Sequence, residues 1–310
     1  MLRIKLITFS LLLVLSGCAS IVSSYIQDAN DFRSDIEKPI WLSQATHHWC
    51  ASEQYSCIDY IDLQTTLPMK KLDYTFTING VANSLILNFS GKVTNKSLVF
   101  VLFPGYRASK ESLEPYFLWL HSLGYRVIIS EGPNSNDSFD FGLTNTKNIK
   151  QILNGKFESG TQYIAVGFSM GIIAATAFTQ TEPSVIGTIG IAPMQRFDLA
   201  IKNYESYFDQ SWWSWFVSDE NLFEGISITL NEAKITLEDT DVRGKFSKPT
   251  LLLASRNDLM APYEYFSNLN ISNVTLVDLN KTHHIQTMLF PERITRESVT
   301  KWIDDLIESK

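Results

Sequence analysis

The residues most able to do chemistry surround Ser169, which lies between Gly167 and Gly171 in the stretch GFSMG. A strand-like apolar run, YIAV, comes directly before this stretch, and an Ala-rich apolar run, IIAATAF, follows it as in a buried helix. A sharp strand-to-helix turn lifts a side chain clear of its backbone, and the two glycines relieve the crowding. The first N–H groups of the helix then face the reacting atoms. The pattern predicts a nucleophilic serine, and the alternative is a serine in an ordinary turn.

A serine hydroxyl needs two partners before it can attack a carbonyl group. A base must take its proton, which a neutral imidazole does well near pH 7, and a carboxylate must hold that imidazole in the right tautomer. Asp258 follows closely on the apolar run PTLLLAS, so we expect its carboxylate at the same sheet edge as Ser169. Asp198, which follows GIAPMQRF, is a rival candidate for the acid.

Strand-like and helix-like segments alternate from about residue 72 to the end of the chain, which predicts an α/β fold with a mostly parallel sheet and helices on both faces. Two alternating segments, 72–78 and 84–89, flank the turn signal Asn79-Gly80 and predict a hairpin. Further strands are predicted at 97–103, 125–130, 162–168, 185–193, 249–255 and 273–279, and helices at 114–124, 144–153, 172–178 and 293–309.

One segment, 195–244, lacks clear strand alternation and interrupts the pattern. It lies between two predicted core strands, so we expect it at the carboxyl ends of the strands, where α/β sheets bind ligands. We interpret it as a cap. Its three tryptophans, Trp212, Trp213 and Trp215, either pack the cap onto the core, which we favour, or stack on substrate.

The composition indicates the number of domains and excludes one class of partner. The chain has 310 residues, 45% of them hydrophobic and 19% charged, which is enough for one large α/β domain. Its formal net charge is -7 and it carries no long basic run, so nucleic acid is not an expected partner.

The N-terminal residues 1–17 have the layout of a secretory signal. Arg3 and Lys5 precede an apolar run that ends in small residues and Cys18, in the sequence LSGC. This ending resembles the lipobox of bacterial lipoproteins, which implies that Cys18 is lipidated and becomes the first residue after cleavage. An ordinary signal with an incidental cysteine is the alternative. By the same resemblance, Ala19 after the cysteine favours an outer-membrane location in a Gram-negative source.

The other two cysteines lie close together in HHWCASEQYSC. In an exported protein the default reading is a disulfide between Cys50 and Cys57. The neighbouring His47 and His48 leave a metal site with the two cysteines as the alternative, which oxidising conditions disfavour.

Residues 72–310 resemble the α/β-hydrolase superfamily, in its capped esterase and monoacylglycerol-lipase-like branch. The resemblance rests on four motifs in the order that the superfamily shows: FPGYRAS, GFSMG, ASRNDLMAP and NKTHHIQTMLFPE. It implies Ser169 as nucleophile and Asp258, rather than Asp198, as acid.

The oxyanion hole and the histidine are also assigned through this resemblance. The backbone N–H groups of Met170 and Tyr106 are the implied donors, although Pro104 stands where the superfamily usually has histidine. Members commonly place Pro-Glu seven positions after the catalytic histidine, and counting back from Pro291 gives His284 rather than His283.

We therefore expect an exported, lipid-anchored serine hydrolase that cleaves carboxylic esters, monoacyl lipids among them, without a metal or organic cofactor. Thioesters and peptides are the alternative substrates, because the triad serves all acyl groups. The alternative is an inactive hydrolase-fold lipoprotein that binds a partner in the cell envelope. The expected division is a signal peptide (1–17), a tether and N-terminal extension (18–70), a first core part (71–194), the cap (195–244) and a second core part (245–310).

Overall fold

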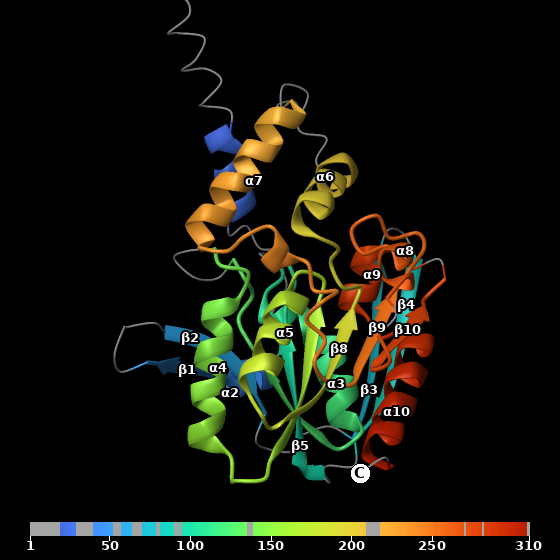
Figure 1. Cartoon of the computed structure of the whole chain (residues 1–310). Coiled ribbons are helices and arrows are strands. Elements are labelled where there is room, and N and C mark those ends of the chain that lie inside the picture. Colours follow the sequence, from blue (N-terminus) through green and yellow to red (C-terminus); the bar gives the residue numbers. More distant parts are fainter. Residues whose placement is uncertain are drawn as a thin grey trace, which may run out of the picture.

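Figure 1 shows the protein as a computed structural model. The structure describes residues 19–28, 40–51, 57–63, 70–78, 81–89, 93, 95–134, 139–208, 218–269, 271–280 and 282–308. The predicted signal peptide, the predicted lipidation site Cys18 and the cap tryptophans Trp212, Trp213 and Trp215 lie outside these residues.

The centre of the molecule is an eight-stranded sheet with the strand order β1-β2-β6-β5-β7-β8-β9-β10. The six strands from β6 to β10 in this order pair in parallel, whereas β1–β2 and β2–β6 pair antiparallel. The strands are β1 (Thr46–Cys50), β2 (Cys57–Asp62), β5 (Asn95–Phe103), β6 (Tyr125–Ile129), β7 (Gln162–Phe168), β8 (Val185–Ile191), β9 (Thr250–Ala254) and β10 (Val274–Asp278). The sheet is mostly parallel, as the sequence predicts.

Helices cover both faces of this sheet because its central strands are apolar on both sides. Along β5, Val99, Val101 and Phe103 face one core, while Phe100 and Leu102 face the other. The first core contains residues of α4 (Leu143–Lys156) and α5 (Gly171–Thr181), and the second contains residues of α3 (Glu114–Ser122) and α10 (Arg293–Glu308). Short helices are η1 (Lys110–Leu113), η3 (Glu238–Thr240), α2 (Ile40–Ala45), α8 (Tyr263–Ser267) and α9 (His284–Leu289).

The central sheet begins earlier in the chain than residue 71, where we placed the start of the core. The hairpin β1–β2 comes from the predicted extension and adds two strands at the β6 edge (Figure 1). Two features that the strand pattern alone does not reveal stabilise it. A disulfide joins its two strands, and the buried carboxylate of Asp62 fixes it to the core by binding Arg126 of β6 and Lys156 of α4. The predicted extension is therefore partly a structural element of the core.

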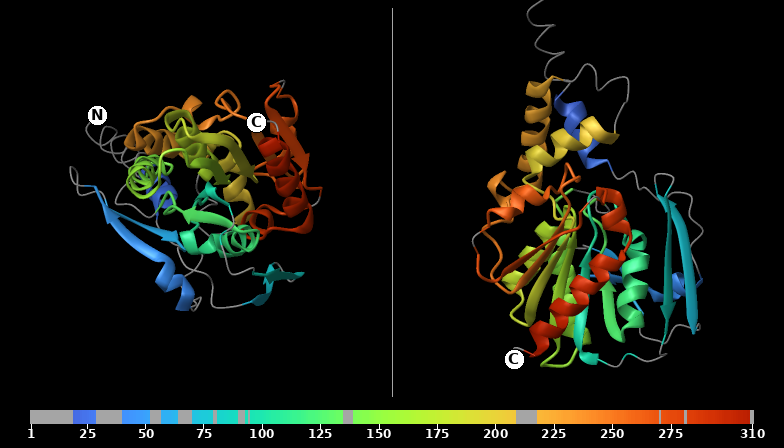
Figure 2. Two further views of the ribbon diagram at one scale, coloured as in Figure 1. Left: turned by 90° about the horizontal axis from the view of Figure 1, so that it is seen from below. Right: turned by 90° about the vertical axis from the view of Figure 1, so that its right-hand side faces the viewer.

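The predicted hairpin at 72–89 forms, but outside the central sheet. Strands β3 (Lys71–Ile78) and β4 (Val81–Asn88) pair with each other as a separate two-stranded sheet. Only one face of this hairpin is buried, because Leu85 and Leu87 of β4 are inside while Ile86 between them is 54% exposed. Figure 2 shows the hairpin at the side of the molecule, close to α3.

Two helices lie between β8 and β9, in the segment predicted as the cap. They are α6 (Phe197–Phe208) and α7 (Asp219–Ala233), and they stand above the carboxyl ends of the parallel strands (Figures 1 and 2). A further helix, residues 19–27, lies beside α7 in both figures. Among the described residues, no helix is long and apolar enough to cross a membrane.

Candidate active site

Ser169 lies on a sharp turn between β7 and α5, and the turn has the strain expected of a nucleophile elbow. Its φ is +49°, a left-handed conformation that non-glycine residues seldom adopt. A Cβ atom added to Gly167 would come 2.4 Å from the Cα of Ile172, and one added to Gly171 would come 2.1 Å from the carbonyl oxygen of Phe103. Both glycines are therefore required by close backbone contacts, on either side of the serine.

The Ser169 hydroxyl joins a chain of hydrogen bonds through His284 to Asp258. The Oγ atom of Ser169 lies 2.8 Å from Nε2 of His284, and Nδ1 of His284 lies 2.6 Å from Oδ2 of Asp258. An ionised carboxylate only accepts hydrogen bonds, so Nδ1–H donates to Asp258 and Nε2 is left to accept from the serine. This tautomer allows His284 to take the serine proton.

All three side chains are nearly buried, since Ser169 is 6%, Asp258 2% and His284 8% exposed. Burial keeps competing water from the hydrogen bonds and strengthens the attraction between Asp258 and an imidazolium. The arrangement can therefore carry out acyl transfer at Ser169.

The turn that follows β9 fixes the Asp258 carboxylate. Its Oδ1 atom accepts hydrogen bonds from the backbone N–H groups of Met260 and Ala261, each at 2.9 Å, which leaves Oδ2 for the histidine. Asp198, the rival acid, is instead paired with Arg196 through two hydrogen bonds of 2.7 and 2.8 Å. The geometry thus separates the two carboxylates that the sequence leaves as alternatives.

The two adjacent histidines point in different directions. His283 is the N-cap residue of α9 and has an extended backbone, with φ −84° and ψ 153°, and its side chain is exposed. His284 begins the helix and is buried against Ser169. The structure therefore brings His284, and not His283, to the serine.

The predicted oxyanion turn lies directly against the serine. A Cβ atom added to Gly105 would meet the carbonyl oxygen of Phe168 at 2.8 Å and the Cβ of Ser169 at 3.1 Å. Tyr106 follows this glycine, and Met170 is the N-cap residue of α5, whose first N–H groups have no partner within the helix. The two predicted donors therefore flank the nucleophile.

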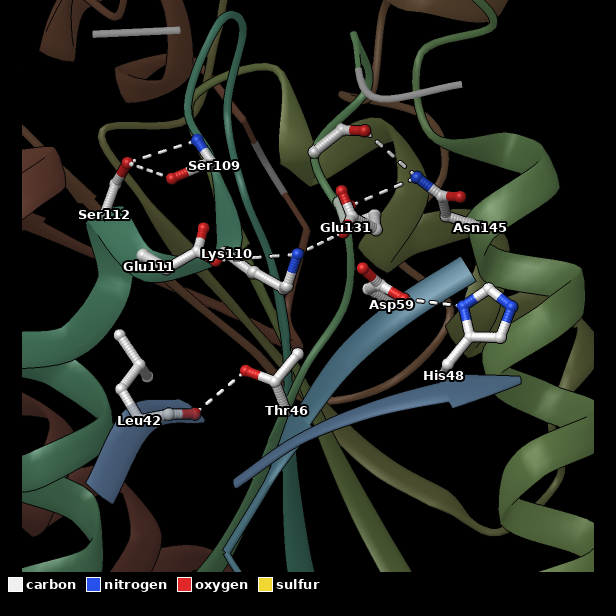
Figure 3. Close-up of polar contacts among 11 residues, drawn as sticks. Leu42, Thr46, His48, Asp59, Ser109, Lys110, Glu111, Ser112, Glu131 and Asn145 are labelled. Atoms are coloured by element: carbon white, nitrogen blue, oxygen red, sulfur yellow. Dashed lines mark hydrogen bonds and ion pairs between the residues drawn. The ribbon is translucent and has the colours of Figure 1, made fainter. Parts of the chain in front are cut away.

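Polar contacts behind the oxyanion turn hold it in place. The side-chain oxygen of Asn134 accepts a hydrogen bond of 2.9 Å from the N–H of Arg107, whose φ is +54°. Figure 3 shows the next layer, where the ammonium group of Lys110 binds Glu131 and lies 3.6 Å from Glu111. Burial by itself would lower the pKa of Lys110, but the charge and hydrogen bond of Glu131, together with the charges of Glu111 and Asp59, outweigh burial and raise the pKa above its usual value. Lys110 thus stays charged and ties the turn to the loop after β6.

An apolar pocket opens at Ser169 and His284. Its walls come from the oxyanion turn, the elbow, α6, the Asp258 turn and α9. The side chains that line it beside the triad are mainly aliphatic, methionine or aromatic, including Met194, Ile201, Tyr204, Met260, Ile285 and Met288. Pockets with an apolar lining of this kind bind apolar groups.

The two predicted disulfide cysteines, Cys50 and Cys57, are bonded to each other across the β1–β2 pair. His48 lies nearby, with Nε2 3.3 Å from the sulfur of Cys50 and Nδ1 2.7 Å from Asp59. The three residues His48, Cys50 and Cys57 have metal-ligand spacing, but disulfide sulfurs lack the thiolate charge that binds metals.

Comparison with solved structures identifies the fold. Mouse α/β hydrolase domain-containing protein 10 superposes with a TM-score of 0.51 at 17% identity, over 85% of this chain and 98% of its own. An α/β hydrolase enzyme from a metagenome of lagoon sediments in Morocco gives 0.50 at 17% identity, over 84% and 98%. The chain has the α/β-hydrolase fold. A bacterial membrane phospholipase A, described as a virulence factor, gives 0.53 at 15% identity, over 99% of both chains. No protein-family model matches the sequence, and no curated protein matches it.

Some residues of this site were not predicted from the sequence. Gly105 and Asn134 were not singled out, although Gly105 lies in the motif FPGYRAS and Asn134 in the polar, Asn-rich stretch EGPNSNDSFDFG. The predicted cap led us to expect that its residues line the pocket, but the sequence did not show that Ile201 and Tyr204 of α6 are the ones that do. The helix at 19–27 gave no signal, because its burial depends on α7, which lies about two hundred residues away in the chain.

Proposed function

We propose that the protein is a serine hydrolase that cleaves carboxylic esters, with monoacyl lipids among its substrates. The observation that carries the proposal is the hydrogen-bonded chain from Ser169 through His284 to Asp258, which opens into an apolar pocket. The α/β-hydrolase fold supports a hydrolase, and the apolar lining favours an acyl group over a charged one.

The proposed reaction has two steps. The Ser169 oxygen attacks the ester carbonyl carbon while His284 takes the serine proton, and the N–H groups of Met170 and Tyr106 bind the carbonyl oxygen as it becomes negative. The C–O bond to the alcohol then breaks, and His284 gives its proton to the leaving alcohol. Water attacks the acyl-enzyme in the second step, with His284 again as base, and releases the carboxylic acid.

The location of this activity is also a proposal. Cys18 in the sequence LSGC would carry the lipid, so that the enzyme is attached to the cell envelope, with the outer membrane facing the periplasm as the favoured site. The disulfide between Cys50 and Cys57 supports export, since disulfides persist in oxidising compartments.

Ester hydrolysis by the purified mature chain tests the proposal. We expect turnover of p-nitrophenyl butanoate by the wild type and a loss on the order of a million-fold in Ser169→Ala. Ser122→Ala is the matched control, because this serine ends α3 and its hydroxyl donates a hydrogen bond to the carbonyl of Trp119 within its own helix. A wild type that hydrolyses no ester would favour the inactive binding protein instead.

A further inference from the structure

The residue directly after the proposed oxyanion donor has a strained backbone. Arg107 follows Tyr106 and has a φ of +54°, a left-handed conformation that non-glycine residues seldom adopt. Such a conformation persists only where the surrounding contacts hold it. Tyr106 lies between this residue and Gly105, which packs against the serine. The two neighbours of Tyr106 therefore set the direction of its N–H group.

The contacts that hold Arg107 lead to the C-terminal end of the helix at 19–27. The guanidinium group donates a hydrogen bond of 2.8 Å to the carbonyl oxygen of Tyr25 and lies 4.4 Å from the centre of the Tyr25 ring. The N–H of Arg107 donates to the side chain of Asn134, whose amide group donates in turn to the carbonyl oxygen of Asp28 at 3.3 Å. The last carbonyls of a helix lack partners within it and carry partial negative charge, which suits a guanidinium group.

The helix at 19–27 is itself fixed to the cap. Gly225 of α7 lets it approach closely, because a Cβ atom there would come 2.5 Å from Cγ1 of Val22. The hydroxyl groups of Ser23 and Thr229 hydrogen bond at 3.0 Å within this contact. These contacts place the helix against α7 independently of the oxyanion turn.

Arg107 lies behind the oxyanion turn, on the side away from the reacting atoms. Among the described residues, those that line the pocket at Ser169 include Tyr106 but not Arg107. Its side chain is instead directed to Tyr25. A change at Arg107 therefore acts on the reaction through the turn, and not through contact with a substrate in that pocket.

We infer that Arg107 is a positioning residue for the oxyanion turn, and that the helix at 19–27 is the fixed support to which it binds. The inference rests on the proposed function and adds to it how the site is kept competent. The Tyr106 N–H faces the developing negative charge while Arg107 holds the end of the helix and α7 holds the helix in place. The proposed cleavage before Cys18 leaves this helix in the mature chain.

Arg107→Met tests the positioning role with p-nitrophenyl butanoate as substrate. Methionine keeps an apolar stem but removes the donors, so we expect kcat to fall at least about tenfold and KM to stay within about threefold. Arg107→Lys keeps the charge and a donor for the Tyr25 carbonyl, and it should lose at least about threefold less. Arg243→Met is the matched control, since this arginine also stacks on a tyrosine ring, that of Tyr265 at 4.1 Å, and pairs with Asp241.

A double-mutant cycle tests the helix as the support. Gly225→Leu displaces the helix at 19–27 from α7 while leaving a good helix-forming residue in place. We expect it to lower kcat at least about threefold. The double variant with Arg107→Met should lose about as much as Arg107→Met alone, because both changes break the same support. Gly155→Leu is the control, since this glycine also lies in a helix and nothing lies within 4 Å of its added Cβ.

Circular dichroism shows whether each variant is folded, and Arg107→Leu or Tyr25→Ala replaces a variant that is not. A folded Arg107 variant with kcat within twofold of the wild type overturns the positioning role. A folded double variant that loses the product of the two single losses overturns the role of the helix. A wild type that hydrolyses no ester overturns the proposed function itself, so the failures are distinguishable.

Discussion

Ser169 has a strained backbone conformation, which the residues packed around it maintain. Its positive φ lifts the hydroxyl toward His284, and the glycines at 167 and 171 remove the clashes that the turn would otherwise create. Close contact also requires glycine at position 105, because a side chain there would keep the oxyanion turn from lying against the serine. At the level of single residues, the site therefore requires glycine at these three positions as well as the reactive side chains.

Replacing Gly105 by alanine should impair catalysis more than folding. The added Cβ would meet the backbone carbonyl of Phe168 at 2.8 Å, so the turn carrying the Tyr106 N–H must move. Since loss of one oxyanion donor lowers kcat about 100- to 1,000-fold, we expect a decrease of at least about tenfold in kcat with little change in melting temperature. Gly155→Ala, in open space, is the control. Wild-type kcat in a folded Gly105→Ala variant would remove the oxyanion role from this turn.

The choice of acid can be tested with two isosteric changes. Asp258→Asn keeps an oxygen for the N–H groups of Met260 and Ala261 but disrupts the histidine tautomer, so we expect a loss of about 10,000-fold in kcat. Asp198→Asn should lose far less, because that carboxylate binds Arg196. Ester hydrolysis measured on both variants decides the matter, and an inactive Asp198→Asn beside an active Asp258→Asn would reverse the assignment.

The two histidines provide a similar pair. His284→Ala should lose at least about a thousandfold in turnover of a short-chain ester, since it removes the imidazole that hydrogen bonds to the Ser169 hydroxyl. His283→Ala should lose far less, because this side chain is exposed at the N-cap of α9. The opposite pattern would mean that the histidine register is wrong by one residue.

At the scale of elements, the sequence predicted the alternating core but not its edge. Strands such as 97–103 and 162–168 are almost entirely apolar, and this local property is enough to predict them. The strand β1 has the sequence THHWC and contains no apolar run that would predict a strand. Its position depends instead on the disulfide to β2 and on the contacts of Asp62 in β2 with Arg126 and Lys156. Pairings of this kind depend on the tertiary structure and cannot be read from a local pattern.

Asp62 links β2 to the core and makes the stability depend on pH. Burial alone would raise its pKa, but hydrogen bonds from Arg126 and Lys156 outweigh burial and lower the pKa below its ordinary value of 3.8. Its stabilisation is therefore complete above about pH 3.8 and is lost as the pH falls toward the lowered value. We expect Asp62→Asn to lose about 3 kcal/mol of unfolding free energy at pH 7, since Arg126 and Lys156 are left without their buried partner.

Urea unfolding of Asp62→Asn at pH 7 and at lower pH checks this account. The difference from the wild type should shrink below pH 3.8, as protonation removes the Asp62 charge from the wild type as well. Asp59→Asn is a control on the same strand, because its carboxylate is 46% exposed and binds exposed His48. A difference that stays constant with pH would mean that the Asp62 charge contributes nothing to stability.

At the scale of the whole molecule, the proposed anchor, the cap and the active site form one continuous arrangement. The helix at 19–27 follows the proposed lipidation site, packs on α7 and contacts the oxyanion turn through Arg107. The sequence predicted the catalytic motifs at one end of this arrangement, and lipidation at LSGC at the other end stays a prediction. It did not predict that the helix at 19–27 packs on α7 and contacts Arg107, because the sequence of a short helix does not indicate which distant element it packs against.

Changing Cys18 to serine should separate the protein from the membrane. Without the thiol no lipid can be attached, so we expect an unlipidated chain that is either soluble or retained by an uncleaved signal. Membrane fractionation of expressing cells and mass spectrometry of the mature N-terminus measure the outcome. An unmodified Cys18 at the wild-type N-terminus would contradict lipid anchoring without affecting the hydrolase assignment.

The central claim is that Ser169 is the nucleophile of an active hydrolase, and covalent labelling tests it most directly. The folded wild-type chain is incubated with a fluorophosphonate, and the adduct is located by peptide mass spectrometry. We expect one adduct per chain, on Ser169, with labelling that is lost in Ser169→Ala and strongly slowed in His284→Ala. A folded wild-type chain that takes up no label, or that is labelled equally well after Ser169→Ala, would contradict it.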